Sequence, residues 1–292
     1  MKNKDIFTFR DAEKQAGPVA FSTMLKPAGS ACNLDCHYCY YLDKAVQYGG
    51  RQAVMSDELL ELYVKQYIEA NEVPTVQFCW HGGEPLLLGV DFYRKAMDFQ
   101  QKYADGKKIE NILQTNGTLV DEAWCDLFAG NNFLVGISLD GPQDIHDAFR
   151  LTKGGRPTFE RVMRTIEMFQ RSGVEYNTLS VVNRLCEGRG GEIYRFFRDT
   201  VHSRYMQFLP AVEHVVDKPG FHRPLIVSPD REGARLAEWS VTAKGYGGFL
   251  CDVFDVWVVS DVGRTFVQMF DATLAQWCGC LLYTSPSPRD CS

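Results

Sequence analysis

Three cysteines on one short segment constrain this chain more than any other feature. Cys32, Cys36 and Cys39 have the spacing C-x3-C-x2-C within the run Cys-Asn-Leu-Asp-Cys-His-Tyr-Cys. Cysteine thiolates ligate the irons of iron–sulfur clusters, so this triplet can hold three irons of a [4Fe–4S] cube and leave the fourth open to an exogenous ligand. Structural zinc instead takes four closed ligands, often from paired C-x2-C motifs. We therefore expect an iron–sulfur site, with a non-catalytic zinc-binding module as the alternative.

Composition narrows the class of protein and its partners. The chain has 292 residues, of which 45% are hydrophobic and 23% charged, as is usual for one large α/β domain or two smaller ones. The net charge is −6 and no dense basic patch occurs, which argues against nucleic acid or a membrane surface as a partner. No apolar stretch is long enough to span a bilayer, and the start of the chain does not resemble a signal peptide. We therefore expect a cytoplasmic protein.

Strand-like and helix-like segments alternate along the first two-thirds of the sequence. Strands are expected at 19–25, 75–80, 109–114, 133–139, 175–182 and 205–210, and helices at 56–70, 92–103, 121–129, 158–172 and 191–199. Ser56 is placed to cap the first of these helices and Gly173 to end the fourth. The repeated pattern of about six β–α units predicts an α/β fold, with a parallel sheet curled into a full or partial barrel. In such barrels the chemistry gathers at the carboxyl ends of the strands.

The character of the sequence changes after residue 217. A stretch punctuated by Pro and Gly leads to helical segments expected around 246–257 and 265–277. Near the C-terminus, Ser-Pro-Ser-Pro cannot continue a helix and has little to bury. We divide the chain into a lead-in at 1–18, the barrel at 19–217, a helical linker at 218–279 and a tail at 280–292 that reads as non-native.

Polar motifs follow three of the expected strands. They are His-Gly-Gly-Glu-Pro at 81–85, Gln-Thr-Asn-Gly-Thr at 114–118 and Ser-Leu-Asp-Gly-Pro at 138–142, with His146 and Arg150 shortly after. Adjacent glycines let a backbone approach a ligand closely, and a carboxylate beside them can accept hydrogen bonds from an ammonium group. Each motif alone is an ordinary turn, since Asn-Gly and Asp-Gly favour turns. Together with the cysteine triplet, they predict that these polar residues lie around a shared opening at one end of the sheet.

The order of these motifs resembles that in anaerobic sulfatase-maturating enzymes, which are radical S-adenosylmethionine (radical SAM) proteins with a C-terminal extension of the SPASM type. The matching runs are Lys-Pro-Ala-Gly-Ser, the cysteine run with the two tyrosines after it, Gly-Gly-Glu-Pro, Gln-Thr-Asn-Gly-Thr and Ser-Leu-Asp-Gly-Pro. The resemblance extends over about residues 21–277. It implies a partial (β/α)6 TIM-like barrel of the radical SAM type, followed by a short helical C-terminal segment.

The resemblance also implies roles for single residues. Cys32, Cys36 and Cys39 would bind the [4Fe–4S] cluster. The other implied contacts are Gly82, Gly83 and Glu84 for the methionine amino group of S-adenosylmethionine, Ser138, Arg150 and the Val212 backbone for other parts of that cofactor, and Tyr41 and His81 for the substrate side. His81 stands in place of a Gln found in relatives.

The implied activity is that of a radical SAM oxidoreductase. A 5′-deoxyadenosyl radical would take a hydrogen from the β-carbon of a Cys or Ser in a sulfatase polypeptide, and formylglycine would result. The implied partners are the sulfatase and an electron donor that resembles flavodoxin or ferredoxin. An alternative within the same class is another SPASM-type enzyme that modifies peptides, for example by forming a thioether.

The sequence departs from the family pattern at its C-terminal end. The relatives carry two auxiliary [4Fe–4S] clusters there, and an Asp proposed as the base that deprotonates the substrate. We expect this chain to be truncated before both, so its catalytic base is unknown. Cys278 and Cys280 cannot build a four-ligand site alone. Asp271 is expected to be a surface or capping residue of a helix and not a substitute base.

Overall fold

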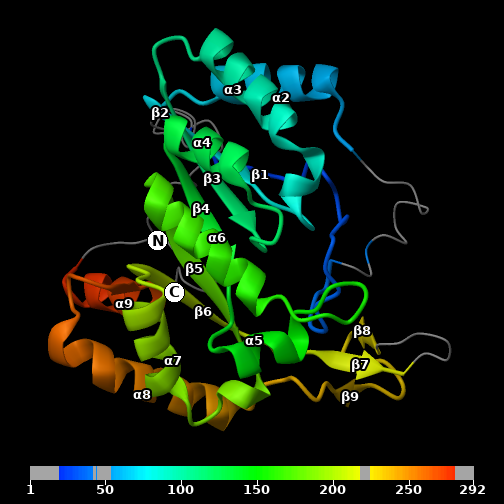
Figure 1. Cartoon of the computed structure of the whole chain (residues 1–292), viewed down its shortest axis with the longest axis vertical. Helices are drawn as coiled ribbons and strands as arrows, with labels where there is room; N and C mark the ends of the chain where they lie inside the picture. Colours follow the sequence, from blue (N-terminus) through cyan, green and yellow to red (C-terminus); the bar gives the residue numbers. More distant parts are fainter. Residues whose placement is uncertain (1–19, 42–43, 45–53, 218–223, 280–292) are drawn as a thin grey trace, which may run out of the picture.

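The computed structural model describes residues 20–41, 44, 54–217 and 224–279. Within these residues, seven parallel strands form one sheet, in the order β1-β2-β3-β4-β5-β6-β10 (Figure 1). The strands are β1 (Met24–Leu25), β2 (Thr75–Trp80), β3 (Lys108–Thr115), β4 (Phe133–Ser138), β5 (Glu175–Val182), β6 (Tyr205–Pro210) and β10 (Phe266–Val267). Neighbours from β1 to β6 follow one another in the chain, as expected for repeated β–α units. The predicted parallel α/β fold is confirmed.

Helices connect the strands. They are α2 (Asp57–Ala70), α3 (Val90–Tyr103), α4 (Glu122–Gly130), α5 (Gln143–Phe149), α6 (Phe159–Ser172) and α7 (Gly190–Arg195), with short helical turns η2 (Pro85–Leu88), η3 (Arg184–Cys186) and the π-helical η4 (Phe196–Thr200). Two expected helix ends are confirmed. Ser56 accepts a hydrogen bond from the Leu59 amide and caps α2, and Gly173 ends α6 at a φ of 69°, which favours glycine.

The core lies between the sheet and these helices. Along β4, Phe133, Val135 and Ile137 lie on one face and are buried, and Gly136 on the other face is also buried. This agrees with the strand covered on both faces that the continuous apolar run predicted. Gly136, between them, has a steric role, since a Cβ there would come within 2.0 Å of the Gln114 side chain on β3. That small residue lets Gln114 lie across the neighbouring strand and reach the carboxyl end of β4.

The region after residue 217 differs from the expectation in detail. Two helices are present, α8 (Ala243–Ser260) and α9 (Gln268–Trp277). The two-residue strand β10 between them pairs with β6 and extends the main sheet, which a pattern search cannot detect in so short a segment. A second sheet was also missed, in which β7 (His214–Val216) pairs antiparallel with β8 (Leu225–Val227) and β9 (Arg235–Leu236).

The proposed domain boundaries stay predictions, and those at 1–18 and 280–292, with Cys280, lie outside the described residues. No helix in the described part of the chain combines the length and apolarity required to cross a bilayer.

Candidate iron–sulfur and cofactor site

A cavity of about 290 Å³ opens at the carboxyl ends of the parallel strands. Most of the residues expected from the sequence line it: Cys32, Cys36, Cys39, Tyr41, His81, Gly82, Gly83, Ser138 and Arg150. Two expected residues do not. Glu84 is fully buried behind the wall, and Val212 is 54% exposed, although its neighbours Ala211 and Glu213 line the cavity. The topology therefore brings residues from five separate segments to one place.

The cysteine loop is held by backbone hydrogen bonds to the segment after α5. The Asp35 amide donates to the Leu151 carbonyl at 2.8 Å, and the His37 amide donates to the Phe149 carbonyl at 3.1 Å. Leu34 forms an isolated bridge with the residue after Leu151. These hydrogen bonds anchor the loop beside the cavity that its three cysteines line.

Burial favours the protonated form of the Cys32 and Cys36 thiols as long as no cluster is bound. Burial raises the pKa of Cys32 to about 11 and that of Cys36 to about 12, in the absence of metal. Thiolates are the ligating form, so binding of iron would release these protons. Within the described residues, no group of three or more His, Cys, Asp or Glu side chains is placed around a single metal ion. In a [4Fe–4S] cube each thiolate binds a different iron, so the ligands of a cluster lie around a volume and not around one point.

The Gly-Gly-Glu motif packs directly against the chain that leads into the cysteine loop. The Glu84 amide donates to the Ala31 carbonyl at 2.7 Å, and a Cβ at Gly83 would come within 2.1 Å of that same carbonyl oxygen. Gly82 has a φ of 125°, a conformation that favours glycine. The two glycines are thus required for the close approach of β2 to the loop.

The Glu84 carboxylate joins the ends of β2 and β3. It accepts hydrogen bonds from the amides of Leu86 at 3.0 Å and Asn116 at 2.8 Å, and from the Thr115 hydroxyl at 2.8 Å. Burial raises its pKa to about 7. A contact between Glu84 and the methionine amino group of a cofactor stays a prediction, since the carboxylate lies behind the residues that line the cavity.

An amide network next to Cys32 was not expected. The Asn116 side chain donates to the Asn33 side chain at 2.9 Å, and Asn33 donates to the Thr118 hydroxyl at 2.8 Å. Asn116 also lies 3.8 Å from the Cys32 sulfur. The motif at 114–118 pointed to this end of the sheet, but nothing in the sequence indicated that it would pair with Asn33, which lies inside the cysteine run.

The family model for the radical SAM superfamily matches residues 27–186 of the chain, which include most of the residues that line this cavity. The chain belongs to the radical SAM superfamily. Proteins of this superfamily use a [4Fe–4S] cluster and S-adenosylmethionine, so both are cofactors of this chain. The cysteine triplet on the cavity wall fits the cluster, and the remaining cavity offers polar groups for the second cofactor.

Curated relatives point to one branch of the superfamily. Over 257 residues the chain is 47% identical to a serine-type anaerobic sulfatase-maturating enzyme of Bacteroides thetaiotaomicron, a match that covers 88% of this chain and 62% of the relative. It is 36% identical over 264 residues to a cysteine-type enzyme of Clostridium novyi, covering 88% of this chain and 65% of that relative. The chain thus spans less than two-thirds of the length of these relatives.

A solved structure is also similar to this chain over most of its length. Native anSMEcpe with bound AdoMet and Cp18Cys peptide superposes with a TM-score of 0.75 at 33% identity, covering 91% of this chain and 67% of that one.

The part of the cavity wall where the sequence predicts a substrate-facing side carries two aromatic rings, Tyr41 and His81. The rings of Tyr41 and His81 lie 5.9 Å apart, and the Lys26 ammonium lies 4.9 Å from the centre of the Tyr41 ring. Burial lowers the pKa of His81, which favours its neutral form. Glu213 also lines the cavity, and burial raises the pKa of its carboxylate. Sequence reasoning missed Glu213, because it follows β6 without a recognisable motif.

Proposed function

We propose that this chain is the radical SAM part of an enzyme that oxidises a Cys or Ser residue of a sulfatase polypeptide to formylglycine. The observation that carries the proposal is the 47% identity to the Bacteroides serine-type enzyme over 257 residues, 88% of this chain. The solved relative with a bound peptide supports a polypeptide as the substrate. Both serine-type and cysteine-type relatives match, so the proposal includes both target residues.

The residues of the chain have separable tasks in this proposal. Cys32, Cys36 and Cys39 hold the cluster, which together with S-adenosylmethionine supplies a radical able to remove a hydrogen atom from the substrate. Ser138 and Arg150 bind the second cofactor. Further proposed tasks are contact of the Val212 backbone with the adenine, contact of Glu84 with the methionine amino group, and a substrate-facing position for Tyr41 and His81. A rigid wall suits this chemistry, because correct placement of the reacting atoms accounts for much of the rate.

The same proposal includes a flavodoxin- or ferredoxin-like electron donor, because the cluster must be reduced before it can act. It also includes a cytoplasmic location. Two auxiliary clusters are expected in the longer enzyme of this type.

The test uses two proteins and two peptides. The 292-residue chain, and a chimera that joins it to the unmatched part of the Bacteroides relative, are reconstituted anaerobically with iron and sulfide and reduced. Each receives S-adenosylmethionine and one of two peptides, which contain Cys-x-Pro-x-Arg or Ser-x-Pro-x-Arg. The chimera should convert a peptide with a mass loss of about 18 Da for Cys or about 2 Da for Ser, as oxidation to an aldehyde requires.

The remaining outcomes discriminate between the alternatives. A thioether-forming enzyme would remove about 2 Da from the Cys peptide and leave the Ser peptide unchanged. Unchanged peptides with the chimera, while 5′-deoxyadenosine accumulates, would contradict sulfatase maturation. One zinc per chain without acid-labile sulfide would favour the metal-binding module.

A further inference from the structure

The carboxylate of Asp140 joins several parts of the cavity wall, although Asp140 itself does not line the cavity. Asp140 follows β4 and is completely buried. Its Oδ1 accepts a hydrogen bond from the Val181 amide on β5 at 3.0 Å and lies 3.0 Å from Nε of Arg150. Its Oδ2 accepts a hydrogen bond from the Tyr38 hydroxyl, in the cysteine loop. One side chain thus links two strand ends, the cysteine loop and the segment after α5.

Arg150 is the group through which this arrangement reaches the cavity. It is the only Lys or Arg among the described residues that line the cavity. Its guanidinium carbon lies 5.5 Å from the centre of the Tyr38 ring. Burial opposes its charge, but the Asp140 carboxylate outweighs that effect and holds the pKa of Arg150 above its ordinary range. Although Nε of Arg150 lies 3.0 Å from Asp140 Oδ1, the pair does not have hydrogen-bond geometry, so the contact is an ion pair.

A long arginine side chain loses considerable rotamer entropy when it is fixed, so a cation that must meet a ligand benefits from being held beforehand. Here the Tyr38 ring packs beside the guanidinium and the Asp140 carboxylate compensates its charge. His146 fixes Asp140 in turn, since its Nδ1 accepts from the Asp140 amide at 3.4 Å. The Asp140 backbone carbonyl also accepts from the Ser180 hydroxyl at 3.0 Å.

We propose that Asp140 is a positioning residue, which together with Tyr38 fixes the Arg150 guanidinium in the cavity wall for the anionic carboxylate of S-adenosylmethionine. We call Asp140, Tyr38 and Arg150 the Asp140 network. The inference rests on the proposed function only in using the cavity as the cofactor site. It requires no sulfatase peptide, so a failure to convert peptides leaves it intact.

A double-mutant cycle tests the inference. Asp140→Asn, Arg150→Gln and the double variant are reconstituted anaerobically, and the affinity for S-adenosylmethionine is measured by calorimetry, with iron and sulfide content determined for each. We expect Asp140→Asn to weaken binding about tenfold and Arg150→Gln about thirtyfold. The double variant should equal Arg150→Gln, because Asp140 acts through Arg150. Asp144→Asn, at an exposed carboxylate in α5 that pairs with Arg189, is the matched control and should bind normally.

Three results would overturn the inference. They are normal affinity of Asp140→Asn, effects that multiply in the double variant, and loss of the cluster in the double variant, which would make Asp140 a support of the cysteine loop instead. If Asp140→Asn does not fold because Arg150 is left buried and unpaired, the comparison of Arg150→Gln with the double variant still decides. A difference above about threefold between those two contradicts the inference. The spectrum of the reduced cluster, recorded with and without S-adenosylmethionine, should rank the variants in the same order of cofactor affinity.

Discussion

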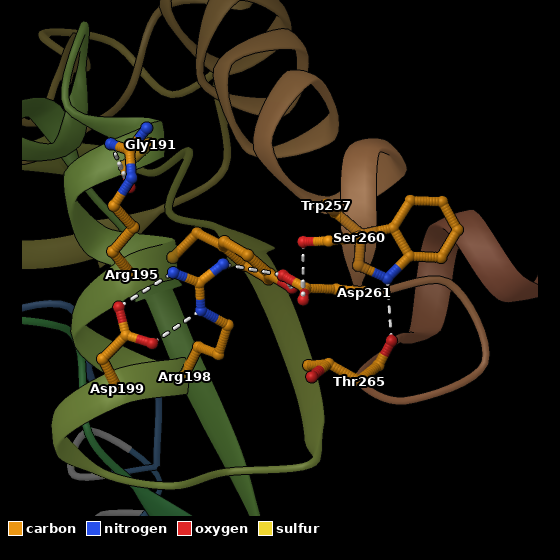
Figure 2. Close-up of polar contacts among 9 residues, drawn as sticks. Gly191, Arg195, Arg198, Asp199, Trp257, Ser260, Asp261 and Thr265 are labelled. Carbon is orange, nitrogen blue, oxygen red and sulfur yellow. Dashed lines mark hydrogen bonds and ion pairs between the residues drawn. The ribbon is translucent and has the colours of Figure 1, made fainter.

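Two regions of the molecule use the same three residue types for different ends. Asp261, at the end of α8, accepts a hydrogen bond from the Tyr194 hydroxyl at 2.7 Å and pairs with Arg198 at 2.9 Å. Ser260 adds a further hydrogen bond to the same carboxylate (Figure 2). The Asp140 network has the same composition, an Asp that accepts from a Tyr and pairs with an Arg. Residue identity alone therefore does not separate the two.

Burial and surroundings separate them. The Arg150 side chain is 9% exposed and lines the cavity, whereas that of Arg198 is 27% exposed and also forms a bidentate pair with Asp199 (Figure 2). We call Asp261, Tyr194 and Arg198 the Asp261 network. It ties η4 and α7 to the end of α8, and none of its members lines the cavity. Partly exposed ion pairs contribute modestly to stability, because water screens them. One network therefore fastens the scaffold, while the other places a charge in the cavity wall.

The largest expected effect lies in the cavity region. Cys36→Ala should abolish the site-bound cluster, since one of three protein ligands is lost. Iron and sulfide content and the spectrum of the anaerobically reconstituted protein are the measurements. Cys186→Ala, which removes a buried free thiol outside the cavity lining, should keep the full cluster. Unchanged iron and sulfide in Cys36→Ala would remove Cys36 from the site.

The second prediction concerns pH and Glu84. Between the ordinary carboxyl pKa and about 7, the folded chain keeps a proton on Glu84 that the unfolded chain releases. The folded state therefore loses stability as pH rises through this range, by roughly 3 kcal/mol in total. Glu84→Gln cannot lose a proton, so the difference in unfolding free energy between variant and wild type should shift in favour of the variant from pH 5 to pH 8. A difference that is constant with pH would contradict the raised pKa.

Glu84 also has a predicted role in cofactor binding. If its carboxylate contacts the methionine ammonium, Glu84→Ala should weaken binding of S-adenosylmethionine by about ten- to a hundredfold, the value of one charge-assisted contact. Thermal unfolding of the same variant controls for its three internal hydrogen bonds. Equal affinity in a folded variant would remove Glu84 from the cofactor site.

Asp261→Asn tests the scaffold side of the comparison. It should lower the free energy of unfolding by about 1–3 kcal/mol, because a hydrogen-bonded charge is lost beside Arg198. Although burial opposes it, hydrogen bonding to Arg198 and Tyr194 lowers the pKa of Asp261 in the folded state. The stabilisation is therefore present above the unfolded pKa and disappears as pH falls through the lower folded value. Affinity for S-adenosylmethionine should stay unchanged, and a weaker affinity would mean that the two regions are coupled.

The smallest expected effects come from two substitutions that each remove a single hydroxyl from one network. They sharpen the comparison most, because nothing else in the network changes. Tyr38→Phe should weaken binding of S-adenosylmethionine about threefold, and Tyr194→Phe should lower the free energy of unfolding by about 1 kcal/mol without changing that affinity. Calorimetry and chemical denaturation on both variants give the full table of effects. Identical responses of the two variants would mean that the networks do not differ in function.

Much of the fold was predictable from local patterns. The strands at 75–80, 175–182 and 205–210 have the expected bounds, and the cap of α2 was identified from Ser56. These features depend on residues close in sequence, where side-chain period and hydrogen-bonding groups act directly. Strand β10 and the sheet of β7, β8 and β9 were missed, because such short strands are stabilised by partners distant in the chain.

The sequence by itself determined the cluster chemistry and the side of the sheet on which it lies. The spacing of Cys32, Cys36 and Cys39 predicts the ligands from residues that are close in sequence. Only the tertiary structure decided which polar groups meet. Asp140 and Tyr38 are 102 residues apart and share one hydrogen bond, and Glu84 turned out to join two strand ends. Such pairings depend on how the strands are placed side by side, which no local pattern encodes.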